Sequence, residues 1–163
     1  MTQYQNTLFP PRATAEPAVA VEDAIQIVDL FAGPGGLGEG FSSSGDGNRF
    51  DIIVSAEMDP VARKTLKLRA FYRLLKREYP KGLQDYYRYC NGEAAEPFTP
   101  KTRDFWNRAE EEARQITLGS EEGDSELKKL IDARLNEEGR PWVLIGGPPC
   151  QAYSIVGRAR NQG

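Results

Sequence analysis

A short apolar run followed by two glycines and two prolines constrains the fold of this 163-residue chain more than any other stretch. The run is Trp142 to Ile145, and such a run predicts a strand that is buried on both faces, as strands inside parallel sheets are. Pro148 and Pro149 have no amide hydrogen, so the hydrogen-bonded ladder must stop there. Cys150 follows at the carboxyl end of the strand, which is the end where open α/β sheets bind ligands. We therefore interpret Cys150 as a thiol placed for chemistry.

The cysteine count, the absence of histidine and the absence of a long apolar run exclude several classes of function. Cys90 has no comparable rigid turn around it, so we interpret it as a small, buried hydrophobic side chain. Two distant cysteines argue against disulfide and zinc frameworks, which makes a reducing cytoplasm the expected location. The chain has no histidine, and this excludes every Ser–His or Cys–His mechanism within it. It has neither an apolar run of the roughly 18 residues that a membrane span needs nor a signal-peptide pattern at its start, so no membrane partner is expected.

A second glycine-rich turn lies near the start of the chain. Residues 24–31 predict a strand, and the sequence AGPGGLG at 32–38 follows it directly. Gly33, Gly35 and Gly38 satisfy the pattern G-x-G-x-x-G, in which glycines let the backbone turn tightly and approach a ligand. Residues 51–56 predict a second strand. It ends at Glu57, where sheets of this kind offer a carboxylate to two ribose hydroxyls.

The middle of the chain reads as mostly helical. Asp59 before Pro60 suits the start of a helix, so we interpret Asp59 as structural. The helix predicted over 61–78 has a basic face that we interpret as solvated. Beyond it the sequence predicts a loop over 91–100, a helix over 103–118 and an amphipathic helix over 125–138 that ends at Gly139 and Pro141.

The two glycine-rich stretches resemble motifs of the DNA (cytosine-5) methyltransferases. The run GGPPCQAYSI at 146–155 resembles the catalytic cysteine motif of that family. The run DLFAGPGGL at 29–37 resembles its first motif, which holds S-adenosylmethionine. The order of the glycine turn, the acid after the second strand and the later Pro-Pro-Cys also matches. The resemblance covers about residues 24–60 and 141–160.

The resemblance implies a fold and a division of the chain. The fold is a three-layer α/β, Rossmann-like S-adenosylmethionine-dependent methyltransferase fold, with a mostly parallel sheet, helices on both faces and an incomplete carboxyl side. Residues 23–163 would be the amino-terminal part of the catalytic domain, while the prolines among small and polar residues in 1–22 predict a flexible arm. Within the catalytic part, residues 80–140 would hold a helical insertion.

The resemblance also implies roles for individual residues. Cys150 would be the nucleophile that adds to carbon 6 of a flipped cytosine, so that carbon 5 can take the methyl group. Phe31 and Met58 would flank the adenine of the cofactor, and Glu57 would bind its ribose. The full set implied to bind S-adenosylmethionine is Phe31, Ala32, Gly33, Pro34, Gly35, Gly36, Leu37, Glu57, Met58 and Pro148. The residues implied to contact DNA are Gln151, Ser154, Arg158 and Arg160.

Other family features would follow the cysteine motif, namely a Glu-Asn-Val motif, an arginine-containing motif, a target-recognition region and a last helix–strand element. We therefore expect the chain to be inactive alone. It would act on double-stranded DNA together with the carboxyl-terminal part of the enzyme, or with a partner chain that supplies it. The formal charge of −3 fits this expectation, because the basic DNA-reading surface would lie in that part. The family's adenine-contacting aspartate on the third strand has three candidates here, Asp104, Asp124 and Asp132.

Two other interpretations stay open. A dinucleotide-binding oxidoreductase domain accounts for the first glycine motif and Glu57, but it leaves the Pro-Pro-Cys run unexplained. A non-catalytic, cofactor-binding subunit of a larger methyltransferase accounts for the glycine turn without requiring Cys150 to react. Saturable NADH binding would favour the oxidoreductase, and unchanged activity after Cys150→Ser would favour the non-catalytic subunit.

Overall fold

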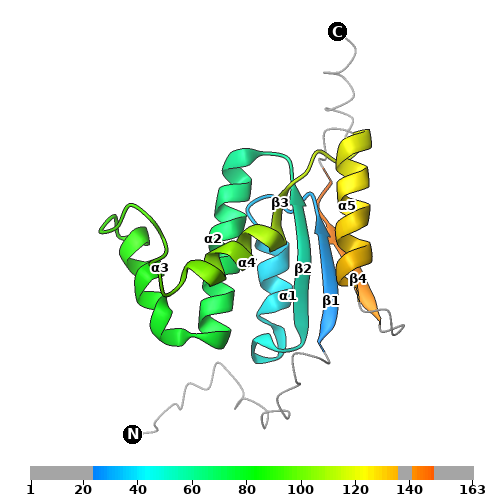
Figure 1. Ribbon diagram of the computed structural model, residues 1–163. Coiled ribbons are helices and arrows are strands. Elements are labelled where there is room, and N and C mark those ends of the chain that lie inside the picture. The colour runs from blue at the N-terminus through cyan, green and yellow to red at the C-terminus, as the bar shows by residue number, and fades with distance from the viewer. Residues whose placement is uncertain (1–23, 136–140, 149–163) are drawn as a thin grey trace, which may run out of the picture.

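The computed structural model describes residues 24–135 and 141–148, which form a four-stranded sheet with helices on both faces (Figure 1). Its strands are β1 (Ile25–Leu30), β2 (Phe50–Glu57), β3 (Ala113–Gln115) and β4 (Trp142–Gly146). They stand in the order β3-β2-β1-β4, and every pairing is parallel. The predicted α/β class with a parallel sheet is therefore confirmed.

Helices make every connection between the strands. The helices are α1 (Gly36–Ser42), α2 (Pro60–Glu78), α3 (Leu83–Cys90), α4 (Arg103–Glu112) and α5 (Glu121–Arg134), with short 3-10 turns η2 (Ser44–Gly47) and η3 (Pro80–Gly82). In Figure 1, α1 and α2 lie on one face of the sheet and α5 lies on the other. The chain moves outward from β1 to β3 and returns through α5 to β4, on the far side of β1. The strand order therefore reverses between β1 and β4, which is the switch point where open α/β sheets bind ligands.

The core lies between the sheet and α2 and continues into the contact between α2 and α4. Ile27 and Val54 of the sheet are fully buried, as are Phe71 and Leu75 of α2. The Phe71 ring meets the Trp106 ring of α4 edge to face, with 5.3 Å between centroids. This packing joins α4 to the sheet-covering helix. No helix in the described part of the chain is long and apolar enough to cross a membrane.

β4 corrects one expectation from the sequence. The run Trp142 to Ile145 was predicted to be buried on both faces, but β4 is an edge of the described sheet and pairs only with β1. Trp142 is 44% exposed and Leu144 is 55% exposed. A short apolar run indicates a strand, but it does not say how many neighbours cover that strand.

The segment predicted as a helix over 103–118 is a helix followed by a strand. α4 ends at Glu112, and Ala113 adopts an extended conformation. Residues Ala113–Gln115 then pair with Ser55–Glu57 of β2. Three residues are too few to show an alternating pattern, and the acidic residues before them favour a helix. The prediction of a helix was therefore wrong for β3.

The basic face of α2 was predicted to be solvated, and this is wrong for two of its residues. Arg63 and Lys67 both form ion pairs with Glu110 of α4. Lys67 is buried, and its ammonium group lies 3.9 Å from the centroid of the Trp106 ring. Burial, followed by the nearby charge of Arg63, lowers the pKa of Lys67 to about 8. Lys64 is exposed, as predicted.

The expectation that Cys90 is buried was wrong. Cys90 is the last residue of α3, and it is exposed.

Candidate functional site

The carboxyl ends of β1 and β4 meet at the switch point. Leu30 pairs with Gly146 in the parallel register, and the Gly147 N–H donates a 3.2 Å hydrogen bond to the Leu30 carbonyl. A Cβ atom on Gly146 would lie 2.6 Å from that carbonyl oxygen, so only glycine allows the strands to approach this closely. The glycine turn after β1 and the Gly-Gly-Pro run after β4 therefore lie side by side.

The turn after β1 is tight and left-handed at three residues. Phe31, Gly33 and Gly35 have φ angles of 53°, 56° and 88°. The Gly35 N–H closes the turn on the Ala32 carbonyl at 3.0 Å. A Cβ atom on Gly35 would lie 2.8 Å from a Leu66 methyl carbon, so both the conformation and the packing require glycine there. Positive φ is uncommon and strained for a phenylalanine, and Phe31 is 37% exposed at the start of the turn.

The Glu57 carboxylate bonds both to the glycine turn after β1 and to the turn between β2 and α2. Its Oε2 accepts a 2.7 Å hydrogen bond from the Gly33 N–H, and its Oε1 accepts a 2.8 Å bond from the Asp59 N–H. The sequence predicted Glu57 only as a ligand-binding group, and this anchoring role was missed. A carboxylate has about four acceptor positions, so about two remain for a ligand.

Asp59 has the structural role that the sequence predicts. Its Oδ1 accepts hydrogen bonds of 2.9 Å from the Val61 N–H and 2.7 Å from the Ala62 N–H. These are two of the backbone donors that the first turn of α2 leaves without partners. Pro60 occupies the first helical position, where a missing N–H costs nothing.

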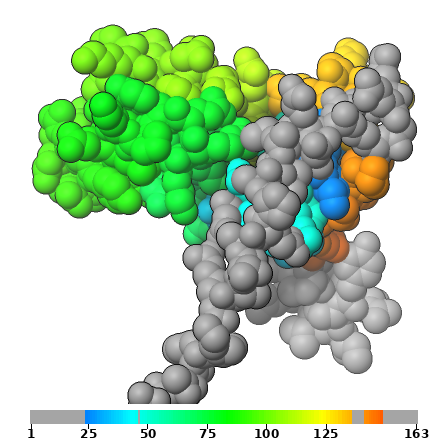
Figure 2. All heavy atoms as spheres, turned by 90° about the horizontal axis from the view of Figure 1, so that it is seen from below, coloured from blue at the N-terminus to red at the C-terminus, as the bar shows by residue number. Residues whose placement is uncertain are grey.

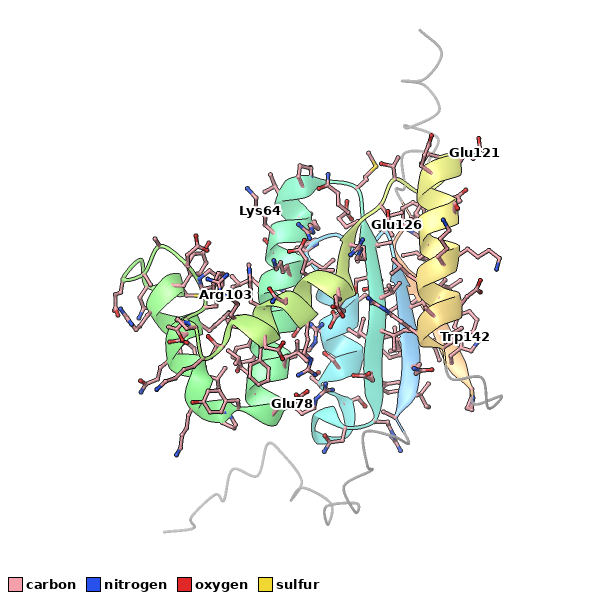
Figure 3. All side chains as sticks on the ribbon, viewed as in Figure 1. Lys64, Glu78, Arg103, Glu121, Glu126 and Trp142 are labelled. Atoms are coloured by element: carbon pink, nitrogen blue, oxygen red, sulfur yellow. The ribbon has the colours of Figure 1, made fainter. Side chains whose placement is uncertain are left out.

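Exposed apolar side chains surround the two turns. Phe31, Leu37 and Met58 are 37%, 46% and 60% exposed, and Val61 in the first turn of α2 is 69% exposed. Val61 was not among the predicted site residues. Because these residues cluster where β1 and β2 end, they form a surface suited to the flat face of a ligand. In Figure 3 the carboxyl ends of the strands lie between Lys64 on α2 and Glu121 on α5, and Glu78 lies at the opposite end of the sheet.

The end of β3 extends the site away from the switch point. The Gln115 side chain donates a 3.4 Å hydrogen bond to the Met58 carbonyl, and the Ile116 N–H donates a 3.1 Å bond to the Glu57 carbonyl. β3 itself carries no acidic residue. The three candidates for the third-strand aspartate lie on helices instead: Asp104 on α4, and Asp124 and Asp132 on α5.

The predicted cofactor residues lie at the carboxyl ends of β1, β2 and β4. Phe31 to Leu37 form the first turn, Glu57 and Met58 end β2, and Pro148 follows the end of β4. The predicted nucleophile Cys150 lies outside the described residues, as does Pro149. The four predicted DNA contacts also lie outside them: Gln151, Ser154, Arg158 and Arg160. Within the described residues, no group of His, Cys, Asp and Glu side chains is arranged to hold a metal ion.

Asp29 and Ser55 lie buried beneath the turn. They are register partners in β1 and β2, and Asp29 is 1% exposed. Neither carboxylate oxygen of Asp29 has a hydrogen-bond partner within the described chain, and neither does the Ser55 hydroxyl. Burial raises the pKa of Asp29 to about 6, against the opposing effect of Arg73. Because buried polar groups without hydrogen bonds cost folding free energy, this pair destabilises the fold directly below the site.

A cavity of about 950 Å³ lies at the other end of the sheet. It is lined by the start of β2 and by the last turns of α1, α2, α4 and α5. Among its charged groups, Arg77 pairs with Asp51 and Arg134 bonds to the Ile53 carbonyl. None of the lining residues belongs to the turns at the carboxyl ends of the strands, so the cavity is separate from those turns.

Two known proteins resemble the chain over most of its length. It is 34% identical over 151 residues to M.Bpa9945I of Bacillus paralicheniformis, across 82% of the chain. It is 30% identical over 135 residues to M.OihORF3336P of Oceanobacillus iheyensis, across 83% of the chain. Both names include the words type II methyltransferase. The chain is similar to type II methyltransferases.

The chain spans only part of these methyltransferases. It covers 32% of the length of M.Bpa9945I and 20% of the length of M.OihORF3336P. No protein-family model matches the chain, and no solved structure matches it. The similarity to the two methyltransferases therefore concerns a region of each rather than the whole protein.

Proposed function

We propose that the chain is the part of a DNA methyltransferase that binds S-adenosylmethionine and carries the nucleophile for methylation of cytosine at carbon 5. The observation that carries this proposal is the meeting of two turns at the switch point. The glycine turn after β1 adjoins the run that leads from β4 to Cys150. The similarity to two type II methyltransferases supports the coarser part, methyl transfer, and favours a role in a restriction–modification system.

The residues around the first turn fit S-adenosylmethionine. Gly33 has no side chain to keep a ligand from the backbone, and the space where its Cβ would lie is open. Glu57 keeps about two acceptor positions for the ribose hydroxyls, and Phe31 and Met58 offer exposed apolar surface to the adenine. When bound, the cofactor supplies an electrophilic methyl group.

Cys150 provides the chemistry that cytosine itself lacks. Carbon 5 of cytosine is a weak nucleophile, and adding the Cys150 thiolate to carbon 6 makes it a stronger one. After carbon 5 has taken the methyl group, its proton passes to a base. The bond between sulfur and carbon 6 then breaks, which restores the aromatic ring and the free thiolate. The target base must first leave the duplex stack, because carbon 6 is covered there.

The cofactor site is tested by calorimetric titration with S-adenosylhomocysteine. We expect the Glu57→Ala variant to bind at least about tenfold more weakly, because two ribose contacts and the anchor on Gly33 are lost together. Glu122→Ala is the matched control, since Glu122 is an exposed glutamate on α5. Binding that Glu57→Ala leaves unchanged would contradict the proposed site. Saturable binding of NADH would favour an oxidoreductase instead.

The nucleophile is tested in the enzyme completed by its carboxyl-terminal segment, with S-adenosylmethionine and duplex DNA that contains 5-fluorocytosine. Fluorine at carbon 5 blocks the proton loss that precedes release, so the covalent adduct with Cys150 should survive denaturing electrophoresis. Cys150→Ser should abolish the adduct, and Cys90→Ser should keep it. Methylation that continues in Cys150→Ser would point to an amino nitrogen as the acceptor, since that reaction needs no thiol.

The proposal includes a second component. We propose that the chain needs a carboxyl-terminal segment, on the same polypeptide or on a partner, to supply the surface that reads the DNA sequence. The 163-residue chain alone should therefore methylate no cytosine in duplex DNA. Detectable transfer of a labelled methyl group by the purified chain would contradict this requirement.

A further inference from the structure

One face of α3 has a composition that the proposed site does not explain. Gln84, Tyr87 and Arg88 are three and four residues apart, so they lie on the same side of the helix. All three are exposed, and Tyr87 is 49% exposed. Lys81 in the preceding turn η3 and Lys76 near the end of α2 are exposed as well. We call these five residues the α3 face: Lys76, Lys81, Gln84, Tyr87 and Arg88.

The α3 face carries positive charge that no described carboxylate neutralises. Its three cations form no ion pair with any residue that the structure describes. The acidic residue of α3, Asp85, is engaged elsewhere, since it accepts hydrogen bonds of 2.7 Å from the hydroxyls of both Thr99 and Thr102. Glu78 pairs with Arg77 and Arg108. In a chain of net charge −3, this face is therefore a local cluster of cations and hydrogen-bond donors.

The aromatic residue of the α3 face is held in place by its neighbours. The Tyr87 ring contacts the Tyr86 ring with 5.4 Å between centroids and the Tyr72 ring with 6.5 Å. Lys76 lies one helical turn after Tyr72 on α2, so it is on the same side of α2 as the ring that contacts Tyr87. A tyrosine held by ring contacts and cations at one surface form a preorganised set of donors.

The position of the α3 face separates it from the site at the switch point. α3 lies at the end of the molecule opposite β4 in Figure 1. Figure 2, viewed at right angles to Figure 1, shows the green segment that contains α3 projecting away from the strands. A ligand that bound both this face and the site would have to be long.

We propose that the α3 face binds the sugar–phosphate backbone of duplex DNA at a distance from the target base. Lysine and arginine neutralise phosphates, while glutamine and tyrosine donate hydrogen bonds to phosphate oxygens. The choice of DNA as the polyanion rests on the proposed function. A lipid surface is a poorer fit, because the face exposes no aliphatic side chain that could enter a bilayer.

The test is duplex binding by a variant that removes two of the cations, Lys81→Ala/Arg88→Ala, in the full chain without cofactor. Fluorescence anisotropy would follow a labelled duplex of about 30 base pairs, which at roughly 3.4 Å per base pair extends past a domain of this size. We expect about tenfold weaker binding. We also expect the slope of log affinity against log salt to become shallower by about 2, one for each lost phosphate contact.

The matched control is Lys128→Ala/Lys129→Ala on α5, which removes the same charge from two exposed lysines. This control should keep the affinity and the salt slope. Equal losses in both double variants would overturn the proposal, because net charge alone would then explain them. Absence of duplex binding would also overturn it, as would binding only to an acidic peptide or to phosphatidylserine vesicles.

Measuring cofactor binding by the same variant tests this inference separately from the proposed function. Circular dichroism melting and S-adenosylhomocysteine titration should give the same result for Lys81→Ala/Arg88→Ala as for the unchanged chain. If the variant binds both the cofactor and the duplex as the unchanged chain does, the α3 proposal is wrong. The proposed function would not be affected by that result. Selective loss of duplex binding in a chain that binds no S-adenosylhomocysteine would support the α3 contact and remove the proposed cofactor site.

Discussion

Asp29 places a carboxylate in the core without a hydrogen bond from any described residue. It is buried without a hydrogen-bond partner within the described chain, next to an equally buried Ser55. The nearby Arg73 gives it little relief, because that side chain bonds to Glu39 and Glu112. Gly38 fits closely above it, since a Cβ there would lie 3.0 Å from Oδ2. Asp29 therefore costs folding free energy whenever it is ionised.

Asp29→Asn should stabilise the chain above neutral pH and change little in acid. The pKa of Asp29 in the folded chain is about 6, against 3.8 for the free side chain. The folded state therefore holds the proton more tightly, and stability falls as the pH rises from about 4 through about 6. The shift corresponds to about 3 kcal/mol at most. Urea unfolding near pH 4 and near pH 8 measures it, with the exposed Asp104→Asn as control. A gain that does not depend on pH would contradict this explanation.

Single residues of the site were predictable where the chemistry demands one amino acid. Glycines at positive φ and an acid after the second strand stand out in any sequence, so the first turn and Glu57 were found. The bonds from Glu57 to the Gly33 and Asp59 amides were not predictable, because they depend on the turn that begins at Phe31.

At the level of elements, pattern length decided what the sequence could predict. β1, β2 and α2 match their predicted ranges to within about two residues, because each has a long or well-capped pattern. β3 is too short to show a pattern. α5 begins at Glu121 rather than Ser125, and the signal was Ser120, whose Oγ accepts a 3.0 Å hydrogen bond from the Gly123 N–H. A serine followed by three acids within four residues is a typical helix start.

Asp59→Ala should destabilise the chain by about 1 kcal/mol through the loss of the cap on α2. Asp59→Asn should recover most of that loss, because an amide oxygen can accept the same bonds from the Val61 and Ala62 amides. Denaturant midpoints at one pH measure both variants. Equal losses in the two variants would show that the charge of Asp59, rather than its cap geometry, stabilises the helix.

At the level of the whole molecule, Arg73 joins three helices through two ion pairs. It lies on α2 and pairs with Glu39 of α1 and with Glu112 at the end of α4. The two carboxylates raise the pKa of Arg73 against the effect of its burial, which is the largest single influence. Burial raises the pKa of Glu112, and Arg73 opposes that rise. Arg73 therefore links α1, the helix after the glycine turn, to the end of α4, which leads directly into β3.

Arg73→Ala should destabilise the chain by about 3–5 kcal/mol, because it leaves the largely buried Glu112 carboxylate without its ion-pair partner. The loss should be larger near pH 8 than near pH 5. Without Arg73 the pKa of Glu112 rises further, and an acid with a raised pKa loses stability as the pH increases. Thermal unfolding at the two pH values measures this, with Lys64→Ala on the exposed side of the same helix as control. A loss independent of pH would mean that packing, not charge, is responsible.

The pairing of β1 with β4 sets the order in which the candidate site forms during synthesis. The Gln26 side chain bonds to the Arg134 carbonyl across 108 residues of sequence, and β4 follows later still. Contacts between distant residues close slowly, because the intervening chain must lose its freedom first. β1, β2 and the glycine turn can assemble while β4 is still being translated. β4 therefore joins β1 last, after the glycine turn has already formed.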